Sequence, residues 1–349
     1  MARRQTPALD EALDRWVDAG GRRAWPLGVD FHEMWSALGR CSSGGKRVRP
    51  ELLLTAHRCY GGGDHDVVVR VAAALELLHT AFVIHDDVID RDLVRRGSHN
   101  VSGTFVERAA ERGASADGCL TAGVAAGVLA GDLALAGAVR GIALCGANRP
   151  MTERLLDLLD HSIAVTAAGE LDDVLLSVCE SHDVAVEDIV TMQQHKTAVY
   201  SFQLPLQAGA LLAGAPEDAQ EPLGAVGRLM GIGFQLVDDL RGVFGEESTT
   251  GKSALGDLRE GKLTTLIVHA RSTVAWPHIA PHVGDQELTE NTARVVRDLL
   301  EESGSREFVA RLAQDHLDQG LRTARESGLP AELVTELTLL SAEILESVA

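Results

Sequence analysis

Residues 75–90 read LELLHTAFVIHDDVID, and this stretch decides the fold class of the chain. Its apolar residues recur with helical rather than alternating spacing, which predicts a helix that is buried on most of its sides. Asp86 and Asp90 are one turn apart on such a helix. His79 and Phe82 precede Asp86 by seven and four residues, so they lie on the same face. That face therefore carries an imidazole, an aromatic ring and then two carboxylates at the end of an apolar helix.

The same helical spacing continues along most of the chain, with breaks at glycine, proline and polar clusters. The segments 97–118 and 245–261 are polar and rich in glycine, and we expect mobile loops over a site there. No linker or shift in composition divides the chain, so we expect one all-α domain over residues 1–349, with residues 1–10 disordered. The spacing predicts helices at residues 6–19, 47–59, 65–91, 120–144, 151–179, 185–213, 217–246, 262–279, 286–303, 306–327 and 330–348.

The composition is that of a protein able to bury a large helical core. Hydrophobic residues make up 45% of the chain but aromatic residues only 4%, so we expect a core of small aliphatic side chains, as in close-packed helices. The net charge of −19 argues against non-specific binding of nucleic acid, which needs a basic surface. Five scattered cysteines indicate reduced thiols: Cys41, Cys59, Cys119, Cys145 and Cys179.

Targeting and membrane signals are weak in this sequence. The first ten residues lack the apolar core of a signal peptide, so we expect a cytoplasmic protein. The two most apolar stretches, residues 67–84 and 120–144, are interrupted by charged residues and by His79. We therefore expect buried helices there and no transmembrane segment.

Two acidic clusters follow largely apolar helices. Asp86 and Asp90 offer hard oxygen atoms at a spacing that suits Mg²⁺, which completes its coordination with water and substrate phosphates. An isolated cluster of this kind is more often a solvated helix end. Asp238 and Asp239 form a second pair after the apolar run 230–237, and two such pairs are hard to explain as independent accidents. Facing each other, the two pairs would form a multi-metal cradle for a diphosphate.

Basic residues supply the counter-charge for such an anion. Residues 44–50, GGKRVRP, hold three cations at an expected helix start, where backbone N–H groups also favour anions. Each basic group alone would be a surface feature, but together they favour a phosphate site in a chain of net charge −19. Further cations follow at Arg95, Arg96, Lys196, Lys252 and Lys262.

Taken in order, these segments resemble the trans-isoprenyl diphosphate synthase, or polyprenyl synthetase, family. The signatures are Gly45-Lys46-Arg47-x-Arg49-Pro50, Leu78-His79 leading to Asp86-Asp87-x-x-Asp90, Arg95-Arg96-Gly97, Lys196-Thr197, Phe234-Gln235-x-x-Asp238-Asp239, and Gly251-Lys252 to Lys262. The resemblance implies an antiparallel helical bundle around a central cavity, the isoprenoid synthase fold, and a homodimer. It also implies a short-chain prenyltransferase that condenses isopentenyl diphosphate with an allylic diphosphate.

The resemblance also assigns roles to single residues. Mg²⁺, with three ions per site implied, would be held by Asp86, Asp87, Asp90, Asp238 and Asp239. The catalytic residues would be Asp86, Asp90, Asp238 and Lys196. The allylic diphosphate would contact Arg95, Lys196, Thr197, Gln235, Lys252 and Lys262, and isopentenyl diphosphate would contact Lys46, Arg49, His79 and Arg96. Metal ions and cations would stabilise the negative charge that grows on the leaving diphosphate.

Two positions depart from the family pattern. The second acidic motif has Gly242 where a third Asp is usual, and Glu170 stands where many relatives carry Gln. The pair Asp238 and Asp239 is retained, so we expect the second metal site to function. Glu170 has no assigned role.

Product length is expected to depend on Phe82, which lies about 6 Å deeper than Asp86 along the helix and nearly on the same face. Ala81 before it is small, which leaves room and favours a C20 product, geranylgeranyl diphosphate, over the C15 alternative. The ring of Phe82 would otherwise be ordinary core. A class I terpene cyclase and a non-catalytic regulatory subunit are further alternatives. The cations for isopentenyl diphosphate disfavour the first, and the intact aspartates disfavour the second.

Overall fold

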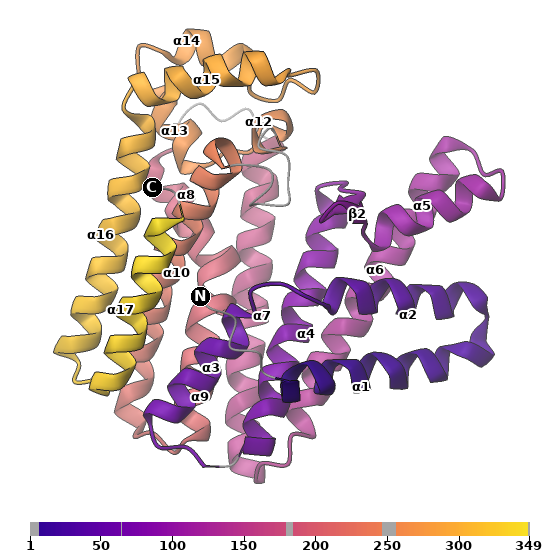
Figure 1. The fold of residues 1–349 in the computed structure, drawn as a ribbon, viewed down its shortest axis with the longest axis vertical. Helices are drawn as coiled ribbons and strands as arrows, with labels where there is room; N and C mark the ends of the chain where they lie inside the picture. The colour runs from indigo at the N-terminus through magenta and orange to yellow at the C-terminus, as the bar shows by residue number, and fades with distance from the viewer. Residues whose placement is uncertain (1–6, 64, 179–183, 246–255, 348–349) are drawn as a thin grey trace. The chain divides into compact units, whose positions relative to one another are not determined.

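The computed structural model describes residues 7–63, 65–178, 184–245 and 256–347, which are almost entirely helical (Figure 1). The longer helices are α1 (Pro7–Ala24), α2 (Val29–Ser42), α3 (Val48–Cys59), α4 (His65–Ile89), α5 (Val101–Glu111), α6 (Ala116–Ala143), α7 (Arg149–Val178), α8 (Val186–Gln193), α9 (Leu204–Leu212), α10 (Gln220–Phe244), α15 (Glu290–Glu302), α16 (Ser305–Glu326) and α17 (Ala331–Glu346). Shorter elements are η1 (Trp25–Leu27), a hairpin of β1 (Val94–Arg95) and β2 (Ser98–His99), the π-helical segment η2 (Gln194–Gln203), η3 (Glu217–Ala219), α12 (Gly256–Glu260), α13 (Thr265–Arg271), α14 (Trp276–Ile279) and η4 (Ala280–His282). The prediction of an all-α fold is confirmed.

The described residues form two compact units. The N-terminal unit lies within residues 1–157 and 211–214, and the C-terminal unit lies within residues 158–210 and 215–349. The first contains α1 to α6, and the second contains most of α7 and the elements from α8 to α17 apart from the end of α9. The expected single domain stays a prediction.

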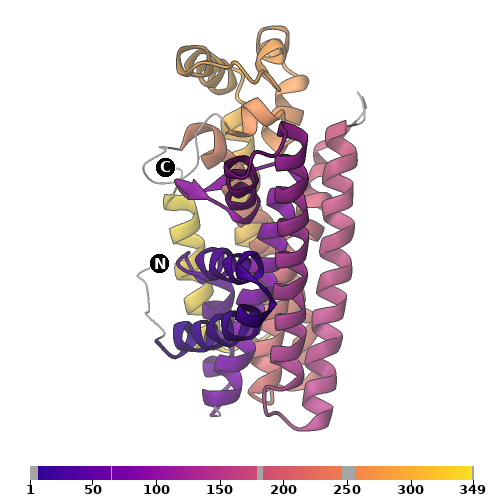
Figure 2. The same cartoon turned by 90° about the vertical axis from the view of Figure 1, so that its right-hand side faces the viewer.

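Helices α1 and α2 of the N-terminal unit form an antiparallel pair (Figure 1), which Figure 2 shows nearly end-on. The rings of Trp16 and Trp35 join them, with centroids 4.9 Å apart. Trp35 and Ala81 of α4 belong to one buried cluster of apolar residues, together with small residues of α6 such as Ala130. The core of this unit is therefore built around α4, the helix that carries the first acidic motif.

Close packing of α4 against α6 depends on glycine. A Cβ atom on Gly127 of α6 would lie 2.2 Å from Cγ2 of Val88, and one on Gly131 would lie 2.1 Å from Nε2 of His85. Both contacts are far shorter than real Cβ contacts, so a side chain at either position would require Val88 or His85 to move. The close approach lies beside the end of α4 that carries Asp86.

Two helices of this unit differ from the sequence-based expectation. The periodicity predicts no helix at residues 29–42, where the structure has α2, and it predicts a mobile loop at 97–118. The loop prediction is wrong, because these residues form the tip and second strand of the β1–β2 hairpin, all of α5 and the start of α6. Asn100 caps α5 by accepting a hydrogen bond from the Gly103 amide at 2.8 Å.

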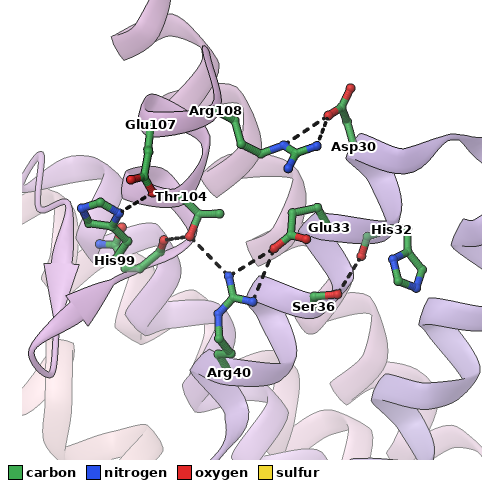
Figure 3. A network of polar contacts seen from close by, with 10 residues as sticks. Asp30, His32, Glu33, Ser36, Arg40, His99, Thr104, Glu107 and Arg108 are labelled. Carbon is green, nitrogen blue, oxygen red and sulfur yellow. Dashed lines mark hydrogen bonds and ion pairs between the residues drawn. The ribbon is translucent and has the colours of Figure 1, made fainter. Parts of the chain in front are cut away.

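Charged side chains join α2 to α5 (Figure 3). Asp30 of α2 accepts a hydrogen bond from Arg108 at 2.8 Å. It also accepts one from Arg112 at 2.6 Å. Arg112 contributes most, and Arg108 next, to lowering the pKa of Asp30 to about 2. Arg40 of α2 also reaches the hydroxyl of Thr104 at 3.4 Å. The polar residues of α5 thus pair with charges of α2, while Val101 and Phe105 of α5 pack against the apolar cluster of this unit.

The structure also differs from the sequence-based expectation at residues 7–10 and 245–279. Residues 7–10 are not disordered: they form the first turn of α1 and bury Leu9. The helix expected at 262–279 is divided into α13 and α14, with turns at residues 272–275. In the expected loop 245–261, residues 256–260 form α12, and 246–255 lie outside the described residues.

In the C-terminal unit, the helix expected at 185–213 is interrupted by the π-helical segment η2. A Cβ atom on Gly169 of α7 would lie 2.2 Å from the backbone nitrogen of Lys196. One on Gly231 of α10 would lie 2.5 Å from Cβ of Ala198. Glycines on two neighbouring helices therefore leave room for the wider π-helical backbone, and π-helical turns are frequent at functional sites.

Helices α4 and α6 are long and apolar enough, by length and composition alone, to cross a membrane. Their most apolar windows are 72% buried in α4 and 39% buried in α6. Core helices of other proteins pass the same test, so two such helices are weak evidence for a membrane protein. The absence of transmembrane segments and the cytoplasmic location stay predictions.

Candidate active site

The first acidic motif lies at the C-terminal end of α4. The Asp90 amide donates to the Asp86 carbonyl at 2.8 Å, which keeps the two residues one helical turn apart. The Asp86 side chain is 24% exposed and Asp90 is partly exposed, whereas only 2% of Asp87 is exposed. The motif therefore presents two accessible carboxylates and one buried carboxylate.

Arg95, on strand β1, holds the buried carboxylate. Its Nε donates to Oδ1 of Asp87 at 2.7 Å, its Nη2 forms an ion pair with the same oxygen, and Nη2 also lies 3.4 Å from Oδ2 of Asp86. Burial raises the pKa of Asp87, and the positive charge of Arg95 opposes this rise. Burial lowers the pKa of Arg95, but the neighbouring carboxylates outweigh it and raise the pKa. Asp87 thus supports Arg95, and its expected role as a Mg²⁺ ligand stays a prediction.

The basic motif at residues 44–50 lies beside the β1–β2 hairpin. Nη1 of Arg96 donates to the carbonyl of Ser43 at 3.2 Å. The same guanidinium lies over the turn of Gly44 and Gly45, whose φ angles are +75° and +83°. The structure therefore brings the arginine of the hairpin to the start of the basic motif, and the shared ligand expected for these residues stays a prediction.

His79 lies seven residues, about two turns, before Asp86 on α4, and its side chain is partly exposed. Desolvation of the imidazole lowers its pKa well below 6.5. Four positive charges lower it further, those of Arg49, Arg95, Arg96 and Arg47 in that order. His79 is therefore neutral at pH 7 and would contact an anion as a hydrogen-bond donor rather than as a cation.

Backbone strain marks the same region. Among the described residues, those with positive φ that are not glycine are Arg47 at +52°, Arg91 at +61° and Arg96 at +104°. This region of φ costs a residue with a side chain about 1 kcal/mol or more, and such strain gathers at active sites and ligand clamps. All three arginines adjoin the basic motif, the acidic motif or the hairpin.

The second acidic motif, on α10 in the C-terminal unit, repeats the arrangement of the first. Asp238 is exposed, whereas only 7% of Asp239 is exposed. Nε2 of Gln193 donates to Oδ2 of Asp239 at 2.5 Å, and Nε2 of Gln235 donates to Oδ1 at 2.9 Å. In both motifs the first Asp is accessible and the second is buried against donors from the protein.

Lys196 of η2 lies between two carboxylates of α7. Its Nζ is 2.6 Å from Oδ2 of Asp173 and 3.0 Å from Oε2 of Glu170. Glu170 therefore gains a structural role, that of holding Lys196. Asp173 and Gln193 are absent from the sequence-based set, and for Asp173 the helical spacing of three residues from Glu170 is the signal that would have found it.

The sequence of this chain matches known proteins over most of its length. A profile of the polyprenyl synthetase family matches residues 34–297. The (2E,6E)-farnesyl diphosphate synthase of Mycobacterium tuberculosis is 31% identical over 352 residues, which cover 98% of this chain and 90% of the relative. This chain belongs to the polyprenyl synthetase family. The sequence-based prediction of the family is confirmed, and the chain is a trans-prenyltransferase.

Two other members of the polyprenyl synthetase family have different products in their names. The geranylfarnesyl diphosphate synthase of Aeropyrum pernix is 30% identical over 321 residues, covering 90% of this chain and 93% of the relative. A crystal structure of geranylgeranyl pyrophosphate synthase from Corynebacterium glutamicum, complexed with isoprenyl diphosphate and magnesium, has a TM-score of 0.88 and 28% identity, and the match covers 97% of both chains. Membership of the family therefore leaves the product length open.

The remaining site residues expected of a polyprenyl synthetase are spread over both units. Thr197 follows Lys196 on η2 and is partly exposed. Lys262 pairs with Glu260, with Nζ 3.1 Å from Oε2. Lys252 lies outside the described residues. Ala81 is fully buried in the core of the N-terminal unit. Phe82, the other residue expected to control product length, is partly exposed.

The two acidic motifs suit Mg²⁺ by the chemistry of their donors. Asp86 and Asp90 offer carboxylate oxygens one turn apart, and Asp238 offers an exposed carboxylate on α10. Within the described ranges, no three His, Cys, Asp or Glu side chains converge into a closed metal cage. Mg²⁺ bound by one or two carboxylates, with water and substrate phosphates as the other ligands, needs no such cage. The residues therefore fit the metal that the resemblance implies.

Proposed function

We propose that this protein condenses isopentenyl diphosphate with an allylic diphosphate in a Mg²⁺-dependent reaction, with the C20 product geranylgeranyl diphosphate. The observation that carries the proposal lies in the N-terminal unit. Accessible carboxylates of Asp86 and Asp90 lie on the helix that also carries His79, and four arginines act electrostatically on His79. Carboxylates for a metal-bound diphosphate and cations for a second diphosphate are the two requirements of this condensation.

The reaction begins when the carbon–oxygen bond of the allylic diphosphate breaks and both electrons leave with the diphosphate. Bound Mg²⁺, three ions in this proposal, would neutralise charge on that leaving group. Its ligands would be Asp86, Asp90 and Asp238, with Asp87 and Asp239 as support. The cations offered to the same diphosphate are Arg95, Lys196, Lys252 and Lys262, with Thr197 and Gln235 as neutral contacts.

Isopentenyl diphosphate then supplies the nucleophile. Lys46, Arg49, His79 and Arg96 would hold its diphosphate, which leaves its alkene to attack the allylic cation. The new carbon–carbon bond leaves a cation on the former isopentenyl unit, which is neutralised when a proton passes to the released diphosphate. No nucleophile from the protein is required, so positioning and electrostatic stabilisation account for the catalysis.

Product analysis tests this function. The protein should convert C5, C10 and C15 allylic starters to longer diphosphates only when isopentenyl diphosphate and Mg²⁺ are present, as measured by mass spectrometry. Consumption of an allylic diphosphate without isopentenyl diphosphate, giving a cyclic hydrocarbon, would instead identify a terpene cyclase. Accumulation of a C15 product with no further growth would replace the C20 proposal by the C15 alternative.

Replacing Phe82 by Ala should lengthen the products by one or more five-carbon units. The ring lies one turn before Asp86 on nearly the same face of α4, where a growing chain that starts at the acidic motif would meet it. The first condensation should be largely intact, because no ligand of either diphosphate is removed. Chromatography of the dephosphorylated products measures the change.

Phe105→Ala is the matched control for this variant. Phe105 is also partly exposed and packs against the apolar cluster of the same unit, on α5. Its removal should lower stability without changing the product distribution. If Phe82 is only core, Phe82→Ala should behave in the same way, with a loss of roughly 3–5 kcal/mol and unchanged products.

We also propose that the protein is a homodimer in which α6 packs against a second copy. Several large apolar side chains of α6 are exposed, at Leu120, Val124, Val128, Leu129 and Val139. A group of exposed apolar side chains on one helix is unusual unless another surface covers it. Sedimentation should give a dimer for the wild type and a shift toward monomer for Val124→Glu. Val274→Glu, at a valine that is 97% exposed, should leave the mass unchanged.

A further inference from the structure

The basic motif before α3 contains three cations, and the structure separates one of them from the other two. Arg47 is the residue just before α3, and its φ of +52° and ψ of +36° lie in the left-handed region that residues with a side chain seldom adopt. It stands between Lys46 and Arg49, the two residues assigned to isopentenyl diphosphate. A left-handed residue here turns the chain between these two cations, so the backbone of Arg47 affects where both point.

The guanidinium of Arg47 is bound by two carboxylates. Nη1 is 2.8 Å from Oε1 of Glu76 on α4, and Nη2 is 3.2 Å from Oδ1 of Asp10 on α1. The Glu76 side chain is 7% exposed, the Arg47 side chain 19% and the Asp10 side chain 60%. The contact with Glu76 is therefore a largely buried ion pair, and the contact with Asp10 closes it toward solvent.

Arg47 bonds only one of the two carboxylate oxygens of Glu76. Its second oxygen, Oε2, is buried and has no hydrogen-bond partner in the described part of the chain. A buried carboxylate that loses its cation is strongly unfavourable, so the pair resists separation. The guanidinium of Arg47, held by two carboxylates, is thereby committed to the protein rather than to a diphosphate.

Glu76 lies on the helix that carries the rest of the site. It precedes His79 by three residues, about one turn of α4, and the Thr80 hydroxyl donates to its carbonyl at 2.9 Å. At the other end of the same loop, Nη1 of Arg96 donates to the carbonyl of Ser43 at 3.2 Å. Residues 43–47, which we call the 43–47 loop, are therefore fixed at one end to the hairpin and at the other end to α4.

We propose that Arg47 and Glu76 are positioning residues for isopentenyl diphosphate, which hold Lys46 and Arg49 against the face of α4 that carries His79. The inference rests on the proposed function, because it takes that diphosphate as the ligand of the three residues. The basic motif then divides its cations, two for the substrate and one that anchors the loop. Neither Arg47 nor Glu76 touches the substrate, so their loss should weaken one substrate and spare the chemical step.

Kinetics with each substrate varied in turn test the proposal. Glu76→Gln keeps an acceptor for Arg47 but removes the charge, and it should raise the KM for isopentenyl diphosphate at least about tenfold. The KM for the allylic substrate and kcat should stay within about threefold of the wild type, since no group in contact with either reacting centre changes. Arg47→Lys keeps the charge but loses the planar fork, so its effect should go in the same direction.

Two variants guard against loss of folding. Asp10→Asn alters the exposed end of the cluster, and it should give a smaller rise of about two- to threefold in the same KM. Glu33→Gln is the matched control, because Glu33 pairs with Arg40 at 3.4 Å on α2 of the same unit and lies outside the 43–47 loop (Figure 3). This control should leave both KM values unchanged.

Equilibrium dialysis of isopentenyl diphosphate, without the allylic substrate, separates this inference from the proposed function. If the wild type binds it and Glu76→Gln binds it at least about tenfold more weakly, both stand. If both proteins bind it equally, or if Glu76→Gln lowers only the melting temperature, the positioning role is wrong and the proposed function survives. If the wild type does not bind it at all, the proposed function is wrong and the inference falls with it.

Discussion

Replacing Asp86 by Ala should lower kcat by at least about 10²-fold while the protein stays folded. The side chain is an accessible carboxylate at the end of α4, and in the proposed reaction it holds the metal that stabilises the leaving diphosphate. Loss of such an electrostatic stabiliser acts on the transition state, so kcat should fall even at saturating substrate. Steady-state rates at saturating Mg²⁺ measure the effect, and circular dichroism checks the fold.

Asp238→Ala should have an effect of similar size, although Asp238 lies on α10 in the other unit. If both carboxylates serve one leaving group, the double variant should lose much less than the product of the two single effects, because residues that act as a unit are not additive. Asp117→Ala and Asp298→Ala, at exposed aspartates of α6 and α15, should leave kcat unchanged. Near-normal turnover of a folded Asp86→Ala variant would overturn the metal-binding role.

Among glycine-to-alanine replacements in the C-terminal unit, Gly169→Ala should lower the stability of the protein most. The new Cβ would lie 2.2 Å from the backbone nitrogen of Lys196 and 2.7 Å from the carbonyl carbon of His195, and a backbone cannot move aside as a side chain tip can. Overpacking of this kind costs about 1–3 kcal/mol or more. Because η2 carries Lys196, we also expect kcat to fall by about tenfold or more, since misplacement by about 1 Å is costly to catalysis.

Gly21→Ala is the matched control, with the same added methyl group in a helix. A Cβ on Gly21 of α1 would meet nothing within 4 Å, so this variant should be stabilised by up to about 1 kcal/mol through helix propensity alone. Thermal unfolding compares the two variants, and turnover is measured on the same samples. Equal melting temperatures and equal turnover for Gly169→Ala and wild type would show that α7 and η2 are not as tightly packed as described.

The first acidic motif shows why much of the site is readable from sequence. Asp86, Asp90, His79 and Phe82 lie on one helix, so their relative placement follows from the helical repeat alone. The long apolar helices α4, α6 and α10 are equally predictable, because their periodicity is strong over many turns. Helices α2 and α5 are not, since the contacts that they make, such as the ion pair of Asp30 with Arg108, join residues that are far apart in the chain.

The local order of residues therefore determined the helical class, the family and the identity of the acidic and basic groups. Only the tertiary structure decided what each group contacts: that Asp87 and Asp239 are buried and serve Arg95, Gln193 and Gln235, and that Asp173 joins Glu170 around Lys196. It also decided that Arg47 of the basic motif pairs with Glu76 of α4. The physical reason is that a charged group pairs with the opposite charge that packing places within a few ångströms of it. Packing, in turn, depends on residues that are distant in sequence.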